Sequence, residues 1–197
     1  PRLSEDTKVL FCTASASPGT PCRWNCQRVA KNALTQEQLR TVLVKALQLA
    51  ESQTTQALRL VWIDIADGIK VLYGIGGRGC DVGDMCRARV DLAEVWCRRK
   101  GPRPLKIAKG PDEAHEIMTD EARTILIHRT SVTEKFGATA KLFPFWDPQK
   151  VSELIHTCAI EGKWKGDDRM WCGAHNIRYT AAQEVWEAAV AAVRART

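Results

Sequence analysis

Residues 57–80 read ALRLVWIDIADGIKVLYGIGGRGC, and the interpretation of this stretch decides the fold. Residues 57–65 are rich in aliphatic and β-branched side chains, which favours a strand. Asp67-Gly68 is a strong hairpin-turn signal, and residues 69–73 then form the returning strand. The stretch therefore predicts an antiparallel hairpin. Alternation along its first strand places Asp64 on a face that is either exposed or lines a site, and we favour the exposed face.

The glycines that follow, in GIGGRGC (residues 74–80), match the dinucleotide-binding pattern G-x-G-x-x-G. That pattern binds pyrophosphate when it lies between a parallel strand and a helix N-terminus. Here the preceding strand belongs to a hairpin, Asp81 and Asp84 stand where the helix begins, and no ribose-binding acid follows. The segment is therefore predicted to be a structural turn, and no cofactor is expected. Arg78 is its candidate substrate-binding residue, because its guanidinium suits an anionic substrate.

Three segments around this stretch have clear helix signals. Residues 35–52 open with a Thr35…Gln38 capping box and carry one apolar stripe. Asp147-Pro148 is an N-cap and first-position pair that starts a second helix. A second capping box at Thr180 opens a terminal helix in which Trp186 faces inward.

The remaining elements are predicted from weaker signals. A helix runs from Asp81 or Asp84 to about residue 98, and a short helix starting near Pro111 carries His115. Strands are predicted at residues 124–128, 141–146 and 171–179. Because hairpins and helices are mixed without alternating, the fold class is predicted to be α+β, with an antiparallel sheet packed against three to five helices.

The cysteine count predicts disulfide bonds. The chain contains eight cysteines: Cys12, Cys22, Cys26, Cys80, Cys86, Cys97, Cys158 and Cys172. An even count spread along the chain favours four disulfides and an oxidising compartment, with the pairing left open. A zinc site is disfavoured because the paired C-x-x-C spacing is missing, so no metal is expected. We therefore predict a single disulfide-stapled domain over residues 1–197, with an irregular, disulfide-tethered segment at 1–34.

Composition and charge narrow the environment and the partners. The 197 residues have a net charge of +6, which favours RNA or another polyanion as a partner, although solubility alone also explains it. No apolar run is long enough for a membrane span, so no membrane insertion is expected. The polar first residues, without an initial Met, suggest a mature product whose leader has been removed. The predicted localisation is therefore secreted and extracellular.

Histidines provide the candidate catalytic groups. His128 closes a predicted strand and His175 follows Cys172 in a predicted disulfide-held segment, and such positions often display catalytic side chains. An imidazole titrates at about pH 6.5, so two histidines can act as general base and general acid. With a lysine to stabilise the charged transition state, such a set cleaves RNA without a metal.

Residues 137–151, GATAKLFPFWDPQKV, followed by SELIHTC, resemble a segment of bacterial EndoU-type ribonuclease toxin domains. In that family two histidines and a lysine precede the Phe-Pro element, and a Tyr or Thr lies in a later strand. The family's glycine-rich segments around the histidines are missing from this chain. Taken over about residues 115–179, the resemblance implies catalytic roles for His115, His128, Lys135, Thr139 and Tyr179.

Two functional hypotheses follow. The first is a secreted, disulfide-rich microbial effector or toxin-like protein that acts on a host or competitor, through a host protein or a polyanion, without assured catalysis. The alternative is a metal-independent secreted ribonuclease with a His/His/Lys site. Its candidate residues are the five that the resemblance implies, together with His175 as a further catalytic group and Lys141 as a substrate-binding group beside Arg78.

Overall fold

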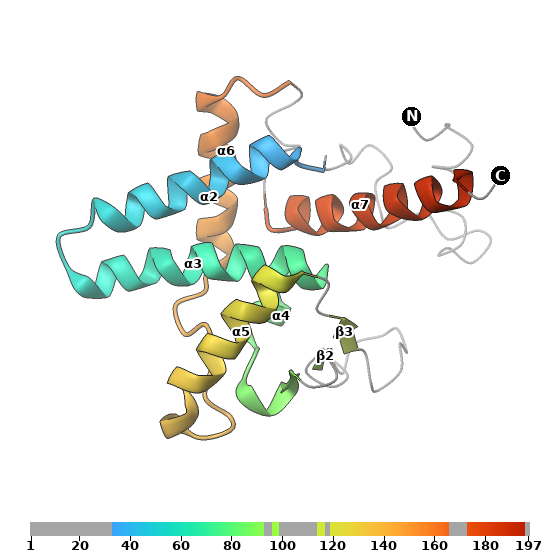
Figure 1. Cartoon of the computed structure of the whole chain (residues 1–197). Coiled ribbons are helices and arrows are strands. Elements are labelled where there is room, and N and C mark those ends of the chain that lie inside the picture. Colours follow the sequence, from blue (N-terminus) through green and yellow to red (C-terminus); the bar gives the residue numbers. More distant parts are fainter. Residues whose placement is uncertain (1–32, 93–95, 99–113, 117–118, 166–172, 196–197) are drawn as a thin grey trace, which may run out of the picture. The chain divides into compact units, whose positions relative to one another are not determined.

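The stretch at residues 57–80 is helical, so the predicted hairpin is wrong. In the computed structural model one helix, α3 (Gln56–Ile75), spans both predicted strands and the Asp67-Gly68 pair (Figure 1). An apolar run of this kind does not distinguish a strand from a helix that neighbouring helices bury. The helix ends at Gly76, whose φ of 57° is the left-handed conformation that glycine adopts without steric cost.

Two glycines within α3 serve close packing instead of a turn. A Cβ atom on Gly68 would lie 2.3 Å from Cε3 of Trp146. A Cβ atom on Gly74 would lie 2.4 Å from the Cβ of Ala122, at the start of α5 (Asp120–Val132). These glycines therefore allow an indole ring and a second helix to approach the α3 backbone.

The structure describes residues 33–92, 96–98, 114–116, 119–165 and 173–195. Contacts divide the chain into Pro1–Ala30, which lies outside the described residues, and Lys31–Thr197. The predicted irregular segment at 1–34 therefore lies almost entirely outside the described residues. Within the second unit, α3 contacts every other α-helix that the structure describes (Figure 1): α2 (Gln36–Glu51), α4 (Gly79–Gly83), α5, α6 (Pro148–Glu161) and α7 (His175–Arg194).

Two of the predicted helices are confirmed by their caps. In α2 the Thr35 hydroxyl accepts a hydrogen bond from Gln38 N at 3.1 Å, and the Gln38 side chain accepts from Thr35 N at 2.8 Å. In α6 the Asp147 carboxylate accepts from Gln149 N at 2.8 Å, with Pro148 at the first position. The caps are local sequence features, which explains why the sequence alone identified them.

The terminal helix is present but differs from the prediction in two respects. It begins at His175, so the strand predicted at 171–179 is wrong from that residue onward. Thr180 is inside the helix, and its buried hydroxyl accepts a hydrogen bond from Leu34 N at 2.7 Å instead of capping the N-terminus. Trp186 is 69% exposed and does not face inward.

The other predicted elements are corrected as well. Instead of one helix ending near residue 98, the chain forms α4, a 3₁₀ turn η1 (Arg87–Arg89) and two short strands. Residues 124–128 belong to α5 instead of a strand, and residues 141–146 contribute only an isolated bridge between Lys141 and Cys86. His115 lies in a strand and not in a helix.

The fold is mostly helical, so the α+β class is wrong. The described strands have two or three residues each: β1 (Val90–Asp91), β2 (Trp96–Arg98) and β3 (Ala114–Glu116). They pair antiparallel in the order β1-β2-β3. The core instead lies among the helices, where its largest fully buried side chains include Ile65, Leu72, Phe143 and Ile155.

The predicted four disulfides are also wrong. Cys80, Cys86 and Cys158 are free thiols. With three of the eight cysteines unpaired, five are left, which allows two disulfides at most. The others, apart from Cys97 in β2, lie outside the described residues.

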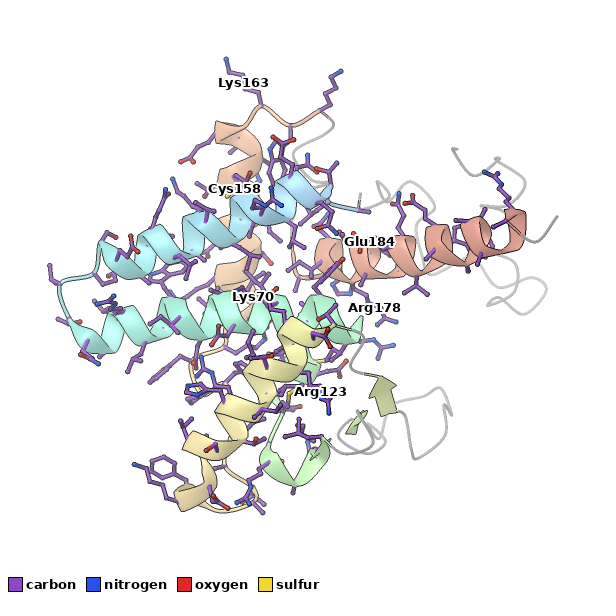
Figure 2. The ribbon with its side chains drawn as sticks, viewed as in Figure 1. Lys70, Arg123, Cys158, Lys163, Arg178 and Glu184 are labelled. Carbon is purple, nitrogen blue, oxygen red and sulfur yellow. The ribbon has the colours of Figure 1, made fainter. Side chains whose placement is uncertain are left out.

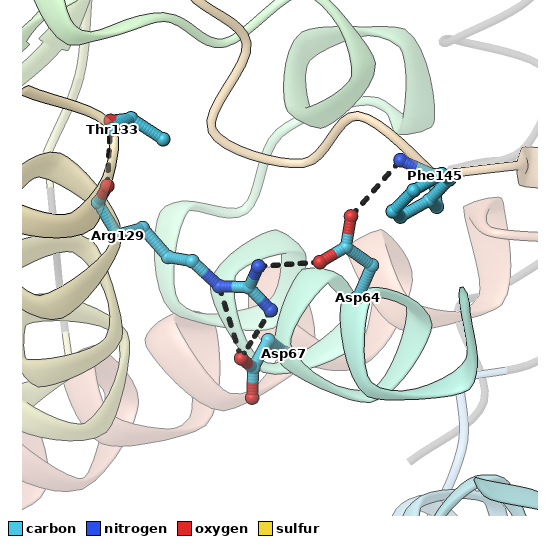
Figure 3. Close-up of polar contacts among 5 residues, drawn as sticks. All are labelled: Asp64, Asp67, Arg129, Thr133 and Phe145. Carbon is cyan, nitrogen blue, oxygen red and sulfur yellow. Dashed lines mark hydrogen bonds and ion pairs between the residues drawn. The ribbon is translucent and has the colours of Figure 1, made fainter. Parts of the chain in front are cut away.

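A buried ionic cluster joins α3, α5 and the segment before α6 (Figure 3). Arg129 pairs through Nη1 with Asp64 at 2.5 Å and through Nη2 with Asp67 at 2.7 Å. The other Asp64 oxygen accepts from Phe145 N at 3.0 Å. Asp64 is therefore buried, only 2% exposed, contrary to the predicted exposed face.

Burial raises the pKa of Asp64, and the Phe145 hydrogen bond and the Arg129 charge only partly offset this effect. Across the described part of the chain, no helix combines the length and apolar character that crossing a bilayer requires.

Candidate functional site

The most notable junction in the fold brings together the starts of α4, α6 and α7. A Cβ atom on Gly79, the first residue of α4, would lie 3.2 Å from the Cβ of Ala174 and 3.5 Å from the Cβ of Pro148. Ala174 directly precedes α7, and Pro148 is the first residue of α6. Segments from the middle and the end of the sequence therefore meet within van der Waals distance.

Arg78 enters this junction from the α4 side. It is the N-cap residue of α4, with an extended backbone, and its side chain is half-buried. Its backbone N–H donates to Oδ2 of Asp81 at 2.7 Å, which fixes the first turn of the short helix. The glycine-rich sequence around Arg78 therefore connects two helices, and it allows the close approach of Gly79 to Ala174.

His175 and Arg178 enter from the α7 side. His175 is the exposed first residue of the helix. Arg178 follows Ala174 by four residues, and this spacing places both on one helical face. Since Ala174 packs against Gly79, the half-buried Arg178 lies on the face of α7 that meets the α4 segment. Figure 2 shows Arg178 projecting from the N-terminal part of α7.

Polar contacts anchor α7 to α2 and α3. Tyr73 of α3 donates its hydroxyl hydrogen to Glu184, which is labelled on α7 in Figure 2. Gln36 of α2 donates to the Tyr73 hydroxyl at 2.9 Å and also to Glu184. Burial, followed by the hydrogen bond to Glu184, raises the pKa of Tyr73, so this phenol stays protonated at neutral pH. These contacts fix the helix that carries His175 and Arg178.

Two arginines, Arg78 and Arg178, bring positive charge to the junction, beside the Asp81 carboxylate that accepts from Arg78 N. Among the described residues, no carboxylate forms an ion pair with Arg78 or Arg178. Four basic side chains elsewhere are paired: Lys45 with Glu161, Lys70 with Glu121, Arg87 with Glu134, and Arg129 with two aspartates. An arginine without a carboxylate partner keeps its donors available for an external anion.

The predicted site residues are distributed over several elements. His128 is exposed on α5, and Lys135 lies in η2 (Glu134–Phe136) with its ammonium 5.1 Å from the Phe136 ring centroid. Thr139 and Lys141 are exposed in the segment that follows η2. The catalytic roles predicted for these residues remain predictions.

The remaining predicted residues lie on β3, α4 and α7. His115 is on β3, where it pairs with Cys97 of β2. Tyr179 is on α7, one turn after His175. Of the predicted residues, Arg78 and His175 are each the chain neighbour of one partner in the contact between Gly79 and Ala174.

Sequence reasoning missed Arg178. The interpretation of residues 171–179 as a strand separated Arg178 from His175, because alternating side chains three residues apart point to opposite faces. In a helix the same spacing places them on neighbouring positions of one surface. A helical interpretation of this segment would therefore have paired them.

The described residues contain no cluster of three or more His, Cys, Asp or Glu side chains that could hold a metal ion.

Comparisons with known proteins are sparse. No family model matches the chain, and no curated protein does so at a significant level. Among solved structures, the chain is similar to a crystal structure of XerA recombinase, with a TM-score of 0.49 and 16% sequence identity. The match covers 93% of this chain, which spans 62% of the recombinase chain.

Proposed function

We propose that Arg78, His175 and Arg178 form a binding site for the phosphodiester backbone of a nucleic acid. The observation that supports this function is the contact of Gly79 with Ala174, which brings basic residues from two distant segments to one junction. Neither guanidinium has a carboxylate partner among the described residues, so both are available to an anion.

The chemistry of these side chains suits phosphate. A guanidinium presents a planar fork of N–H donors that can bind two phosphate oxygens at once. The imidazole of His175 supplies a further donor in either its neutral or its protonated form. The net charge of +6 adds a long-range attraction that increases the rate of encounter with a polyanion.

The proposal does not extend to secretion or to catalysis. An oxidising compartment was inferred from four disulfides, and the free thiols of Cys80, Cys86 and Cys158 remove that argument. Among the described residues, no contact joins the candidate catalytic groups of the ribonuclease hypothesis, such as His128 on α5 and His175 on α7. Binding is the part of the original expectation that the geometry supports.

The test is a binding titration with fluorescein-labelled oligonucleotides, one single-stranded RNA and one double-stranded DNA, followed by fluorescence anisotropy. We expect the wild-type protein to bind at least one of them. Arg78→Ala and Arg178→Ala should each weaken binding to it by about tenfold, which corresponds to a loss of about 1.4 kcal/mol. Each variant should also reduce the magnitude of the slope of log K against log salt concentration by about 1, which corresponds to the loss of one phosphate contact.

A matched control separates the site from overall charge. Arg40 is exposed on α2, outside the α4–α6–α7 junction, so Arg40→Ala removes the same charge at another place. If Arg40→Ala weakens binding as much as Arg78→Ala, the attraction is nonspecific and the site is not as proposed. Absence of binding to both oligonucleotides would reject the function altogether.

A further inference from the structure

One buried aromatic side chain connects the ionic cluster to the proposed phosphate site. Trp146, 9% exposed, lies just before the N-cap of α6. Its indole N–H donates to the carbonyl oxygen of Gly79 at 2.6 Å, in a buried hydrogen bond. A charge-neutral N–H bonded this closely to a buried carbonyl holds that peptide in one orientation.

The ring of Trp146 occupies space that two glycines leave open. A Cβ on Gly68 of α3 would approach Cε3 to 2.3 Å, and a Cβ on Gly83 at the end of α4 would approach Cδ1 to 3.0 Å. The indole therefore lies against the backbones of both helices. Together with the bond to Gly79, it contacts α4 at both its first and its last residue.

Trp146 is itself held from the other side. The preceding residue, Phe145, donates its backbone N–H to Asp64, and Asp64 also forms an ion pair with the buried Arg129. Trp146 N donates to the carbonyl of Phe143 at 3.2 Å and closes a tight turn. The segment that carries the indole is thus also held by α3 and, through the pairing of Asp64 with Arg129, by α5.

We propose that Trp146 is a positioning residue for the phosphate site, whose indole N–H fixes the Gly79 carbonyl and thereby the position of the first turn of α4, where Arg78 is the N-cap. This inference rests on the proposed function, because it concerns the arginine assigned there to phosphate. The Gly79 carbonyl belongs to the peptide between Gly79 and Cys80. Asp81 binds both the N–H and the carbonyl of Arg78, so the bond from Trp146 positions the first turn of α4 together with its N-cap residue. Arg178 is held by α7 and its anchors, and it does not depend on this bond.

The decisive variant is Trp146→Phe, which keeps an aromatic ring against Gly68 and removes the N–H donor. The same anisotropy titration should show affinity for the better-bound oligonucleotide falling by about three- to tenfold, the range that one lost hydrogen bond gives. Trp62→Phe is the matched control, since Trp62 lies half-buried on α3. It should bind like the wild type.

A double-mutant cycle distinguishes positioning from general loosening. Trp146→Phe should add little to Arg78→Ala, because the residue that it positions is already absent, and should add its full effect to Arg178→Ala. Equal effects in both backgrounds, or unchanged affinity in the single variant, would overturn the positioning role while leaving the phosphate site intact. A wild type that binds neither oligonucleotide would overturn both proposals.

A second measurement uses the wild-type protein and needs no substitution. In a ¹⁵N–¹H spectrum the Trp146 indole signal should exchange slowly with solvent and should shift when the oligonucleotide is added. The assignment comes from the one indole signal that Trp146→Phe removes or, if that variant does not fold, from selective labelling. An indole signal that exchanges rapidly, or that stays unchanged at saturation, would contradict the proposal.

Discussion

Arg129 is the residue on which the buried charges of the fold depend. Its side chain is 14% exposed, and its guanidinium bonds Asp64 and Asp67 and lies 5.2 Å from the Phe143 ring centroid. Removing one partner of a buried pair costs more than the pair contributes, because the remaining charge is left without compensation. We therefore predict that Arg129→Met lowers the free energy of unfolding by about 3 to 5 kcal/mol at pH 7, measured by urea denaturation.

The pKa of Asp64 determines how the stability loss in Arg129→Met changes with pH. Burial raises the pKa of Asp64 in the wild type, and removal of Arg129 should raise it further. With a raised pKa, folded Asp64 binds a proton at a pH where unfolded Asp64 does not. The free energy of unfolding therefore increases as the pH falls through the folded-state pKa towards the unfolded-state pKa of about 3.9. The deficit of Arg129→Met should accordingly shrink on acidification from pH 7.

A surface pair provides the comparison for Arg129. Arg87→Met breaks only the exposed bridge to Glu134, so it should cost less than about 1 kcal/mol. A deficit in Arg129→Met that stays constant over the acidic range would show that Asp64 is not the group responsible.

At the scale of elements, the sequence was informative where the signal is local. The capping boxes and the Asp147-Pro148 pair act within one helical turn, and α2 and α6 begin where these features predict. The sequence was misleading where tertiary packing decides. The α3 run is apolar on most sides because helices surround it, and its glycine at 68 is explained by an indole ring that is distant in the sequence.

The same limit applied to the candidate site. Arg78 and His175 were identified from chemistry alone, as a cation in a glycine-rich segment and an imidazole in a loop. Their proximity depends on the contact of Gly79 with Ala174, which no local pattern encodes. Arg178 was missed because the secondary structure assigned to its segment was wrong.

The packing role of Gly68 is testable at this scale. In a helix interior Gly→Ala usually stabilises by about 1 kcal/mol. At Gly68 the new Cβ would clash with the buried Trp146, so we predict that Gly68→Ala destabilises by about 1 to 3 kcal/mol, measured by urea denaturation. Trp146→Leu combined with Gly68→Ala should cost less than the sum of the single changes, because the smaller side chain makes room. Strict additivity would show that the two residues do not interact.

At the scale of the whole molecule, the described part of the chain is stabilised by one helical core, and three of its cysteines are free thiols. The side chains that α2, α3, α5, α6 and α7 bury make up most of a single hydrophobic cluster. A core of this kind suffices for a chain of this length, since domains of roughly 150 residues already bury about 70% of their unfolded surface. For predicting how this fold is stabilised, the even cysteine count is therefore less informative than the distribution of apolar residues among helices.

The thiol content of the whole chain is the most direct check of this conclusion. Without reductant, the unfolded protein should take up at least three equivalents of iodoacetamide, and peptide mass spectrometry should find them at Cys80, Cys86 and Cys158. In the native protein the half-buried Cys80 should react first, while Cys158 is protected because it is 2% exposed and burial raises its thiol pKa, which lowers the thiolate fraction. A fully reduced sample, which should take up eight equivalents, serves as the control. Uptake of fewer than three equivalents by the unreduced sample would support the predicted disulfide framework and contradict the structure.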